Sequence, residues 1–191
     1  IHAANPDAQL TVRNLGFAAD EITVQRRSDD VPTTDWFLGM KKGDTTKPGN
    51  NGIVYKAGTE FGADVIFAYW GFNESFKGPE GVEAFKRDLD AYLGKLLAAK
   101  YNGESAPRVV LFSPIAHENL KSPHFSDGSE NNRNLSLYTE AMAAVAKAKN
   151  VPFVDLFRPS QELYQQAQSP LTINGVHLNE SGDKALAAVQ Y

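Results

Sequence analysis

Runs of apolar residues alternate with helix-like segments from residue 64 onward, and this alternation constrains the fold more than any other feature. The first run, 65–70, is continuously apolar, a pattern typical of a parallel strand that is buried on both faces. Similar runs at 108–113 and 153–157 each follow a segment with helical spacing of apolar residues. This order predicts an α/β fold in which helices cover both faces of a parallel sheet.

Helices are predicted wherever apolar residues recur at helical spacing. The first begins at Pro79 and ends near 102–103. A second passes through residues 137–145, and two short helices are expected near 160–168 and 180–190.

Upstream of the alternation we expect a short strand at 10–14. Residues 17–62 are rich in turn formers and charge, which favours loops and short helices around Trp36, and the loop at 41–58 is open to two interpretations: it shapes a cleft or contacts a partner.

Composition favours one domain over residues 1–191 and excludes several classes of function. The chain is 42% hydrophobic and carries a net charge of −4, which gives no basis for a nucleic-acid partner or an anionic membrane surface. No apolar run approaches the ~20 residues of a membrane span, so no membrane insertion is expected. The absence of cysteine excludes disulfides and thiolate chemistry.

We predict no cofactor and no metal. The nucleotide-binding glycine motifs are missing, which leaves a nucleotide-binding domain as a distant alternative. His117 and Glu118 begin a sequence like a zinc-binding His-Glu-x-x-His motif, but Lys121 occupies the position of the second histidine. These two residues, together with Asn119, are expected beyond a strand end, where they could contact a substrate.

An asparagine follows the first long apolar run, where side chains of a parallel sheet meet ligands. Asn73 is placed to donate its amide to a developing oxyanion, and Gly71 would let the backbone bend sharply towards a ligand. Gly16, after the predicted strand at 10–14, could direct a backbone N–H to the same point. The alternative interpretation makes Asn73 a capping residue and Gly16 an ordinary turn glycine.

A histidine near the C-terminus is the candidate general base. His177 precedes the last predicted helix, and Asn174, three residues earlier, is placed to contact its second ring nitrogen. Histidine is the commonest general base because its ordinary pKa lies near neutral pH. The alternative is a structural histidine.

Together these motifs resemble those of the SGNH (GDSL-like) hydrolases. The resemblance rests on Asn14-x-Gly16, Gly71-x-Asn73 and His177-Leu178-Asn179-x-x-Gly182, in blocks two, three and five of that family. It implies a three-layer α/β/α sandwich around a five-stranded parallel sheet with flavodoxin-like strand order. It also implies a serine nucleophile in block one, oxyanion donors from that serine, Gly16 and Asn73, and a base at His177.

The chain departs from the family pattern at the nucleophile. No block-one turn precedes residue 10, so the family's first strand and serine are expected upstream of Ile1 in a longer chain. The alternative is a branch of the family whose first block is itself degenerate. Within the chain, Ser75 is the better fallback nucleophile and Ser113 the other serine expected at the cleft; neither lies in a Gly-x-Ser-x-Gly elbow.

A second departure is Asn174, where the family usually has aspartate. In a serine protease triad the Asp→Asn change lowers kcat ~10⁴-fold by favouring the wrong tautomer. An amide oxygen that faces the ring N–H would lose less, because only the charge is missing. Asp155 could substitute for the aspartate, although it is also well placed to cap the following helix.

Two hypotheses from different classes remain. The first is a serine hydrolase that acts on short acyl esters, such as acetyl groups on carbohydrate. Gly71, Phe72 and Glu74 would contact the small ester or acylated glycan, and Tyr69 and Trp70 would either stack on a sugar or belong to the core. The second is a catalytically silent module that binds a glycan or protein partner. The resemblance also suggests an extracytoplasmic location, periplasmic or secreted.

Overall fold

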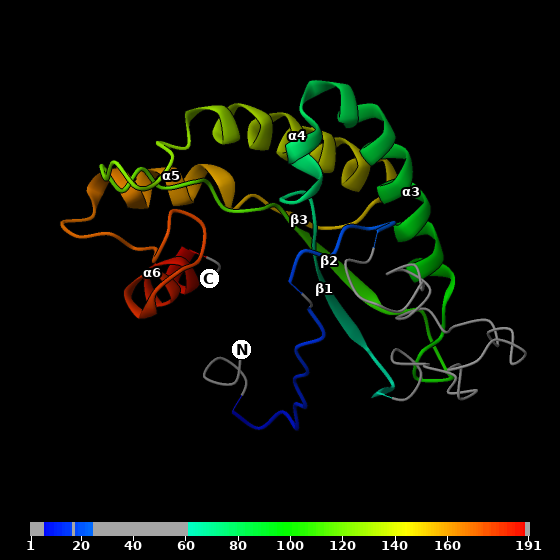
Figure 1. The fold of residues 1–191 in the computed structure, drawn as a ribbon. Helices are drawn as coiled ribbons and strands as arrows, with labels where there is room; N and C mark the ends of the chain where they lie inside the picture. The colour runs from blue at the N-terminus through cyan, green and yellow to red at the C-terminus, as the bar shows by residue number, and fades with distance from the viewer. Residues whose placement is uncertain (1–5, 17, 25–60, 190–191) are drawn as a thin grey trace, which may run out of the picture.

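The computed structural model describes residues 6–16, 18–24 and 61–189, and within them a parallel sheet organises the fold. Its strands are β1 (Val65–Tyr69), β2 (Arg108–Phe112) and β3 (Phe153–Val154), hydrogen-bonded in the order β1-β2-β3 (Figure 1). The predicted α/β architecture with a parallel sheet is confirmed. The described residues contain three strands, where the resemblance implied five.

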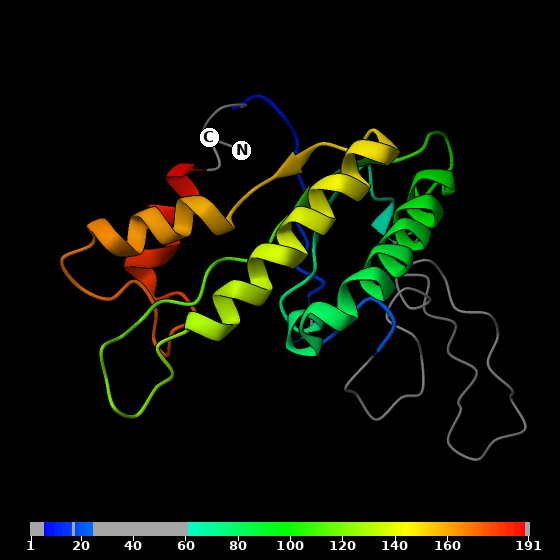
Figure 2. The same cartoon turned by 90° about the horizontal axis from the view of Figure 1, so that it is seen from above.

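One face of the sheet carries the main core. Ile66 and Ala68 of β1 lie beside Val109 and Leu111 of β2, and all four are buried. Against this face pack α3 (Val82–Ala98) and α4 (Ser129–Lys149), which lie side by side in both views (Figures 1 and 2). The apolar residues that face the sheet and the neighbouring helix include Phe85, Leu89, Leu93, Tyr138 and Met142. The predicted helices at 79–102 and 137–145 are therefore confirmed.

The second face is only partly covered. Two shorter helices, α5 (Phe157–Gln166) and α6 (Glu180–Val189), contact β2 and β3 through a cluster that includes Phe112, Leu156 and Leu186. The same face of β1 is exposed: Val65, Phe67 and Tyr69 are 43%, 45% and 53% accessible. Burial of this strand on both faces, and a core position for Tyr69, were wrong predictions for the described residues. Trp70 packs against the main core, as the core interpretation expects.

The strand predicted at 10–14 is absent. Residues 7–16 have no regular secondary structure after an initial turn, and Val12 is 76% exposed. A strand needs a neighbour to satisfy its backbone groups, and this segment pairs with none of the described strands. Trp36 and the loop at 41–58 lie outside the described residues.

The last strand is shorter than predicted, because a helix begins early. The Asp155 side chain accepts hydrogen bonds from the backbone N–H groups of Phe157 and Arg158, at 2.9 and 3.2 Å. These groups belong to the first turn of α5, so the carboxylate satisfies donors that a helix N-terminus leaves unpaired. Strand β3 therefore ends at Val154, and α5 begins at Phe157 rather than near 160.

Two leucines of α4 test the packing of this helix. Leu135 is fully buried, whereas Leu137 is 38% exposed. We expect Leu135→Ala to lower the free energy of unfolding by ~2–5 kcal/mol, since it removes buried methyl groups and leaves a cavity. Leu137→Ala, the matched control on the same helix, is expected to lower the free energy of unfolding by clearly less. Equal losses in chemical denaturation would contradict the packing described here.

Candidate active site

The carboxyl ends of β1 and β2 lead into two loops that carry most of the predicted site. The loop after β1 contains Gly71 and Asn73 and continues into a 3-10 helix, η2 (Glu74–Lys77). A second 3-10 helix, η3 (Pro79–Gly81), connects it to α3. In parallel α/β sheets ligands bind at this edge.

Glu74 holds the loop after β1 in place. Its carboxylate is 5% exposed and accepts hydrogen bonds from the N–H groups of Gly71 (3.0 Å) and Ile22 (2.9 Å). Burial raises the pKa of the Glu74 carboxyl, and these two hydrogen bonds oppose the rise. The structure thus gives Glu74 a role in the loop itself; its contact with a substrate stays a prediction, as does that of Phe72.

Gly71 needs the conformational freedom of glycine. Its φ is +98°, and a Cβ at this position would stand 2.9 Å from the sulfur of Met142. At this φ a larger side chain is strained, and it would also require the Met142 side chain to move. The tight turn brings Asn73 close behind the end of β1.

The Asn73 side chain is oriented by a distant part of the chain. Its Nδ2 donates to the backbone oxygen of Asp20 at 3.1 Å. An amide nitrogen carries two N–H groups, so this bond orients the side chain and leaves its second N–H available to another acceptor. The neighbouring Glu21 is buried and forms an ion pair with Lys77, which ties the same segment to η2.

Gly16 is arranged differently from the prediction. Its N–H donates to the side-chain oxygen of Asn14 at 3.0 Å, and the residue is exposed. To reach an oxyanion, this N–H would have to leave Asn14. The oxyanion role of Gly16 therefore stays a prediction.

His177 lies in the segment 171–179, here called the histidine loop, which is the second part of the connection between α5 and α6. Its Nδ1 is 3.0 Å from Oδ1 of Asn174, the contact that the sequence predicted. The same Asn174 oxygen accepts hydrogen bonds from the N–H groups of Val176 (3.3 Å) and His177 (3.0 Å). Both backbone partners are donors, so the atom that faces the ring is the amide oxygen rather than the nitrogen.

This arrangement determines the tautomer of His177. An amide oxygen only accepts, so Nδ1 carries the proton and Nε2 is free to accept one. The side chain is exposed, and its Nε2 is thereby available to a group outside the loop. Among the described residues no hydrogen bond links His177 to Asn73 or to Gly16, so the structure brings His177 and Asn174 together and leaves their relation to Asn73 as a prediction.

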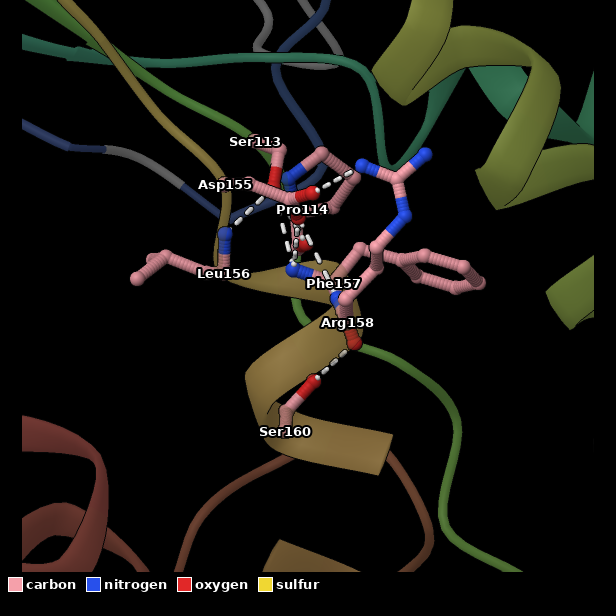
Figure 3. Close-up of polar contacts among 7 residues, drawn as sticks. All are labelled: Ser113, Pro114, Asp155, Leu156, Phe157, Arg158 and Ser160. Carbon is pink, nitrogen blue, oxygen red and sulfur yellow. Dashed lines mark hydrogen bonds and ion pairs between the residues drawn. The ribbon is translucent and has the colours of Figure 1, made fainter. Parts of the chain in front are cut away.

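The two serines considered as nucleophiles are both engaged in the scaffold. Ser75 is buried and donates its hydroxyl to the backbone oxygen of Phe72 at 2.6 Å. Ser113, at the end of β2, accepts hydrogen bonds from the N–H groups of Leu156 (2.8 Å) and Phe157 (3.1 Å) (Figure 3). It joins the ends of two adjacent strands and is 1% exposed.

Asp155 is likewise engaged. Besides the two N–H groups of α5, it forms an ion pair with Arg158, at 2.7 Å from Nη1 to Oδ2 (Figure 3). Of the two interpretations of Asp155, capping of the next helix is the one that the structure shows. Asn174 therefore faces His177 in the place where the family usually has aspartate.

His117 and Glu118, which were considered as possible substrate contacts, are buried. Glu118 accepts hydrogen bonds from Leu171 and Thr172 of the histidine loop, a role that no sequence motif indicated.

Among the described residues no group of three His, Asp or Glu side chains is disposed to hold a metal. Within the same residues no helix combines the length and the apolar character that a membrane span requires.

Comparison with known proteins identifies the family. A model of the GDSL-like lipase/acylhydrolase family matches residues 2–185. The chain belongs to this family. No curated protein matches it.

Solved structures of esterases share the fold of this GDSL-like chain. An aryl esterase from Mycobacterium smegmatis matches at 15% identity with a TM-score of 0.63, over 96% of this chain and 78% of that one. A carbohydrate acetylesterase from Sinorhizobium meliloti gives 14% identity and a TM-score of 0.58, over 90% and 73% of the two chains. An acetylxylan esterase from Geobacillus stearothermophilus gives 16% and 0.53, over 69% and 59%. At such identities the likeness shows the fold alone.

The scaffold role of Ser113 is testable by substitution. Ser113→Ala leaves the buried N–H of Leu156 without an acceptor, which costs ~1–3 kcal/mol of stability, whereas the N–H of Phe157 keeps its hydrogen bond to Asp155. We expect a lower melting temperature and, at a temperature where the variant is folded, no change in any hydrolase activity that the parent protein has. Ser181→Ala, at an exposed serine of α6, is the control and should leave both quantities unchanged. Complete loss of activity in a folded Ser113→Ala variant would instead identify a nucleophile.

Proposed function

We propose that this GDSL-like protein hydrolyses short acyl esters, with acetyl groups on carbohydrate as the substrate class. The observation that carries the proposal is the contact between His177 Nδ1 and Asn174 Oδ1, which leaves Nε2 as a proton acceptor. The named activities of the three structural relatives, an aryl esterase, a carbohydrate acetylesterase and an acetylxylan esterase, support the substrate class.

The proposed reaction is acyl transfer through a serine. Nε2 of His177 takes the proton of a serine hydroxyl as its oxygen attacks the ester carbonyl, and returns it to the departing alcohol. The Asn73 amide, with its second N–H, stabilises the oxyanion of the tetrahedral intermediate. Water then releases the acyl group by the same steps, with His177 again as base.

The serine itself is proposed to come from a segment N-terminal to Ile1. Two features of the described residues support a further strand at this place. One edge of β1 is unpaired, and Val65, Phe67 and Tyr69 expose an apolar face that continues the surface covered by α5 and α6. A strand and helix from the preceding segment would satisfy both. The acetylxylan esterase, for which a serine-to-alanine exchange gives a catalytic mutant, supports serine chemistry in this fold.

A second candidate function is a silent module that binds a glycan or protein partner. It is favoured by the engagement of Ser75 and Ser113 in the scaffold and by Asn174 in place of aspartate. The full-length protein would then bind acylated glycans in a saturable manner without hydrolysing them.

Substitution of the proposed base distinguishes the two functions. In the full-length protein, His177→Ala is expected to lower kcat for short nitrophenyl esters and acetylated xylo-oligosaccharides by ~10²–10⁴-fold, the usual contribution of a general base. His124→Ala, at an exposed loop histidine, is the matched control and should retain the parent rate. Equal rates in all three proteins would contradict the proposal, and no hydrolysis by the parent protein would favour the binding module.

A substitution of Asn174, the residue beside His177, is expected to raise kcat rather than lower it. Asn174→Asp places a negative charge against the ring N–H, where it stabilises the imidazolium that forms as the serine is deprotonated. We expect kcat to rise by at least ~10-fold, a part of the ~10⁴-fold effect of this exchange in a triad. An unchanged or lower kcat in a folded variant would contradict the role given to this pair.

A further inference from the structure

One buried carboxylate binds the start of the histidine loop through hydrogen bonds. Glu118, in the loop that follows β2, is 6% exposed and reaches the first residues of the histidine loop. Its oxygens accept hydrogen bonds from the N–H groups of Leu171 (3.0 Å) and Thr172 (2.7 Å) and from the Thr172 hydroxyl (2.6 Å). Hydrogen bonds to a carboxylate are stronger than those between neutral groups. The start of the loop is therefore fixed to the edge of the sheet.

The Thr172 hydroxyl extends this attachment to the tip of the loop. While it donates to Glu118, its oxygen accepts a hydrogen bond from the N–H of Gly175 at 3.0 Å. The carbonyl of Gly175 in turn accepts from the backbone N–H of Glu118 at 2.8 Å. Gly175 is thus held at both its N–H and its C=O, and it directly follows Asn174, the residue that orients His177.

The ring of His117 forms a support under the same residue. A Cβ at Gly175 would collide with this ring, and one at Gly128 would approach it to 2.7 Å, so both backbones lie directly against it. The ring is held by Asn131 at 3.0 Å, and its backbone exchanges two hydrogen bonds with Asn132, each 2.8 Å long. The tip of the histidine loop is therefore packed on a fixed surface.

We propose that Glu118 and Thr172 are positioning residues for His177. They act through the histidine loop: Glu118 fixes Thr172, Thr172 fixes Gly175, and Gly175 sets the place at which the Asn174 oxygen meets Nδ1. The inference rests on the proposed role of His177 as general base, but the contact that it explains is present without substrate. Loss of the Thr172 hydroxyl removes the hydrogen bond at the Gly175 N–H and loosens the loop tip, which keeps its attachment through the Gly175 carbonyl.

A matched pair of substitutions at Thr172 separates the hydroxyl from the methyl group. Thr172→Val keeps the shape and removes both hydrogen bonds, whereas Thr172→Ser keeps the hydroxyl and removes a methyl group. We expect Thr172→Val to lower kcat by ~10²-fold, the usual effect of a small misplacement of a catalytic group, with KM nearly unchanged. Thr172→Ser is expected to retain most of the parent rate.

The tautomer of His177 gives a readout that does not require activity. Long-range nitrogen–hydrogen correlation spectra of the imidazoles, recorded above the ordinary pKa of histidine, report which ring nitrogen carries the proton, and His177→Ala assigns the signal. We expect the Nδ1–H form in the parent protein and in Thr172→Ser. In Thr172→Val we expect a mixture of both tautomers, because the loosened loop tip weakens the contact between the Asn174 oxygen and the ring.

The control is a second buried threonine on α4. Thr139 is 2% exposed and its hydroxyl has no hydrogen-bond partner among the described residues, so Thr139→Val should change neither tautomer nor rate. An unchanged tautomer in Thr172→Val, or an equal effect of Thr172→Ser, would overturn the inference. The expected tautomer change in a protein without ester hydrolysis would uphold it and contradict only the proposed function.

Discussion

Two buried carboxylates, one after each long strand, hold together the edge of the sheet at which the candidate site lies. Glu74 follows β1 and accepts the N–H of Ile22, more than fifty residues upstream. Glu118 follows β2 and accepts the N–H groups of Leu171 and Thr172, more than fifty residues downstream. A buried carboxylate is costly unless donors surround it, and here those donors are the backbones of the segments that carry the site. The parallel sheet determines where the loops after β1 and β2 begin. The two carboxylates then attach distant segments of the chain to these loops.

The contrast between local patterns and contacts that are distant in sequence explains which features could be predicted. Helical spacing identified α3 and α4, and apolar runs identified β1 and β2, because both patterns report local burial. The order of Gly71, Asn73 and His177 identified the family, since the motif residues keep their spacing relative to those elements. The contact between Asn174 and His177 was predictable because only three residues separate them.

The remaining features depend on partners that are distant in sequence. Residues 10–14 form no strand because they pair with none of the described strands, and nothing in their own sequence reveals whether a neighbouring strand is present. A core position was one of the two predictions for Tyr69, because an apolar run is expected to be covered on both faces. In the structure α5 and α6 contact only β2 and β3 on that side. Glu118 was considered as a substrate contact, since nothing in its neighbourhood shows that Leu171 and Thr172 meet it.

The orientation of His177 is the central claim, and covalent trapping of the nucleophile tests it most directly. The full-length protein is treated with a fluorophosphonate, which reacts with a serine only when a base activates it, and the modified peptide is located by mass spectrometry. We expect one labelled serine in the parent protein and in His124→Ala, and a labelling rate reduced ~10²-fold or more in His177→Ala. No labelled serine, or equal labelling with and without His177, would contradict it.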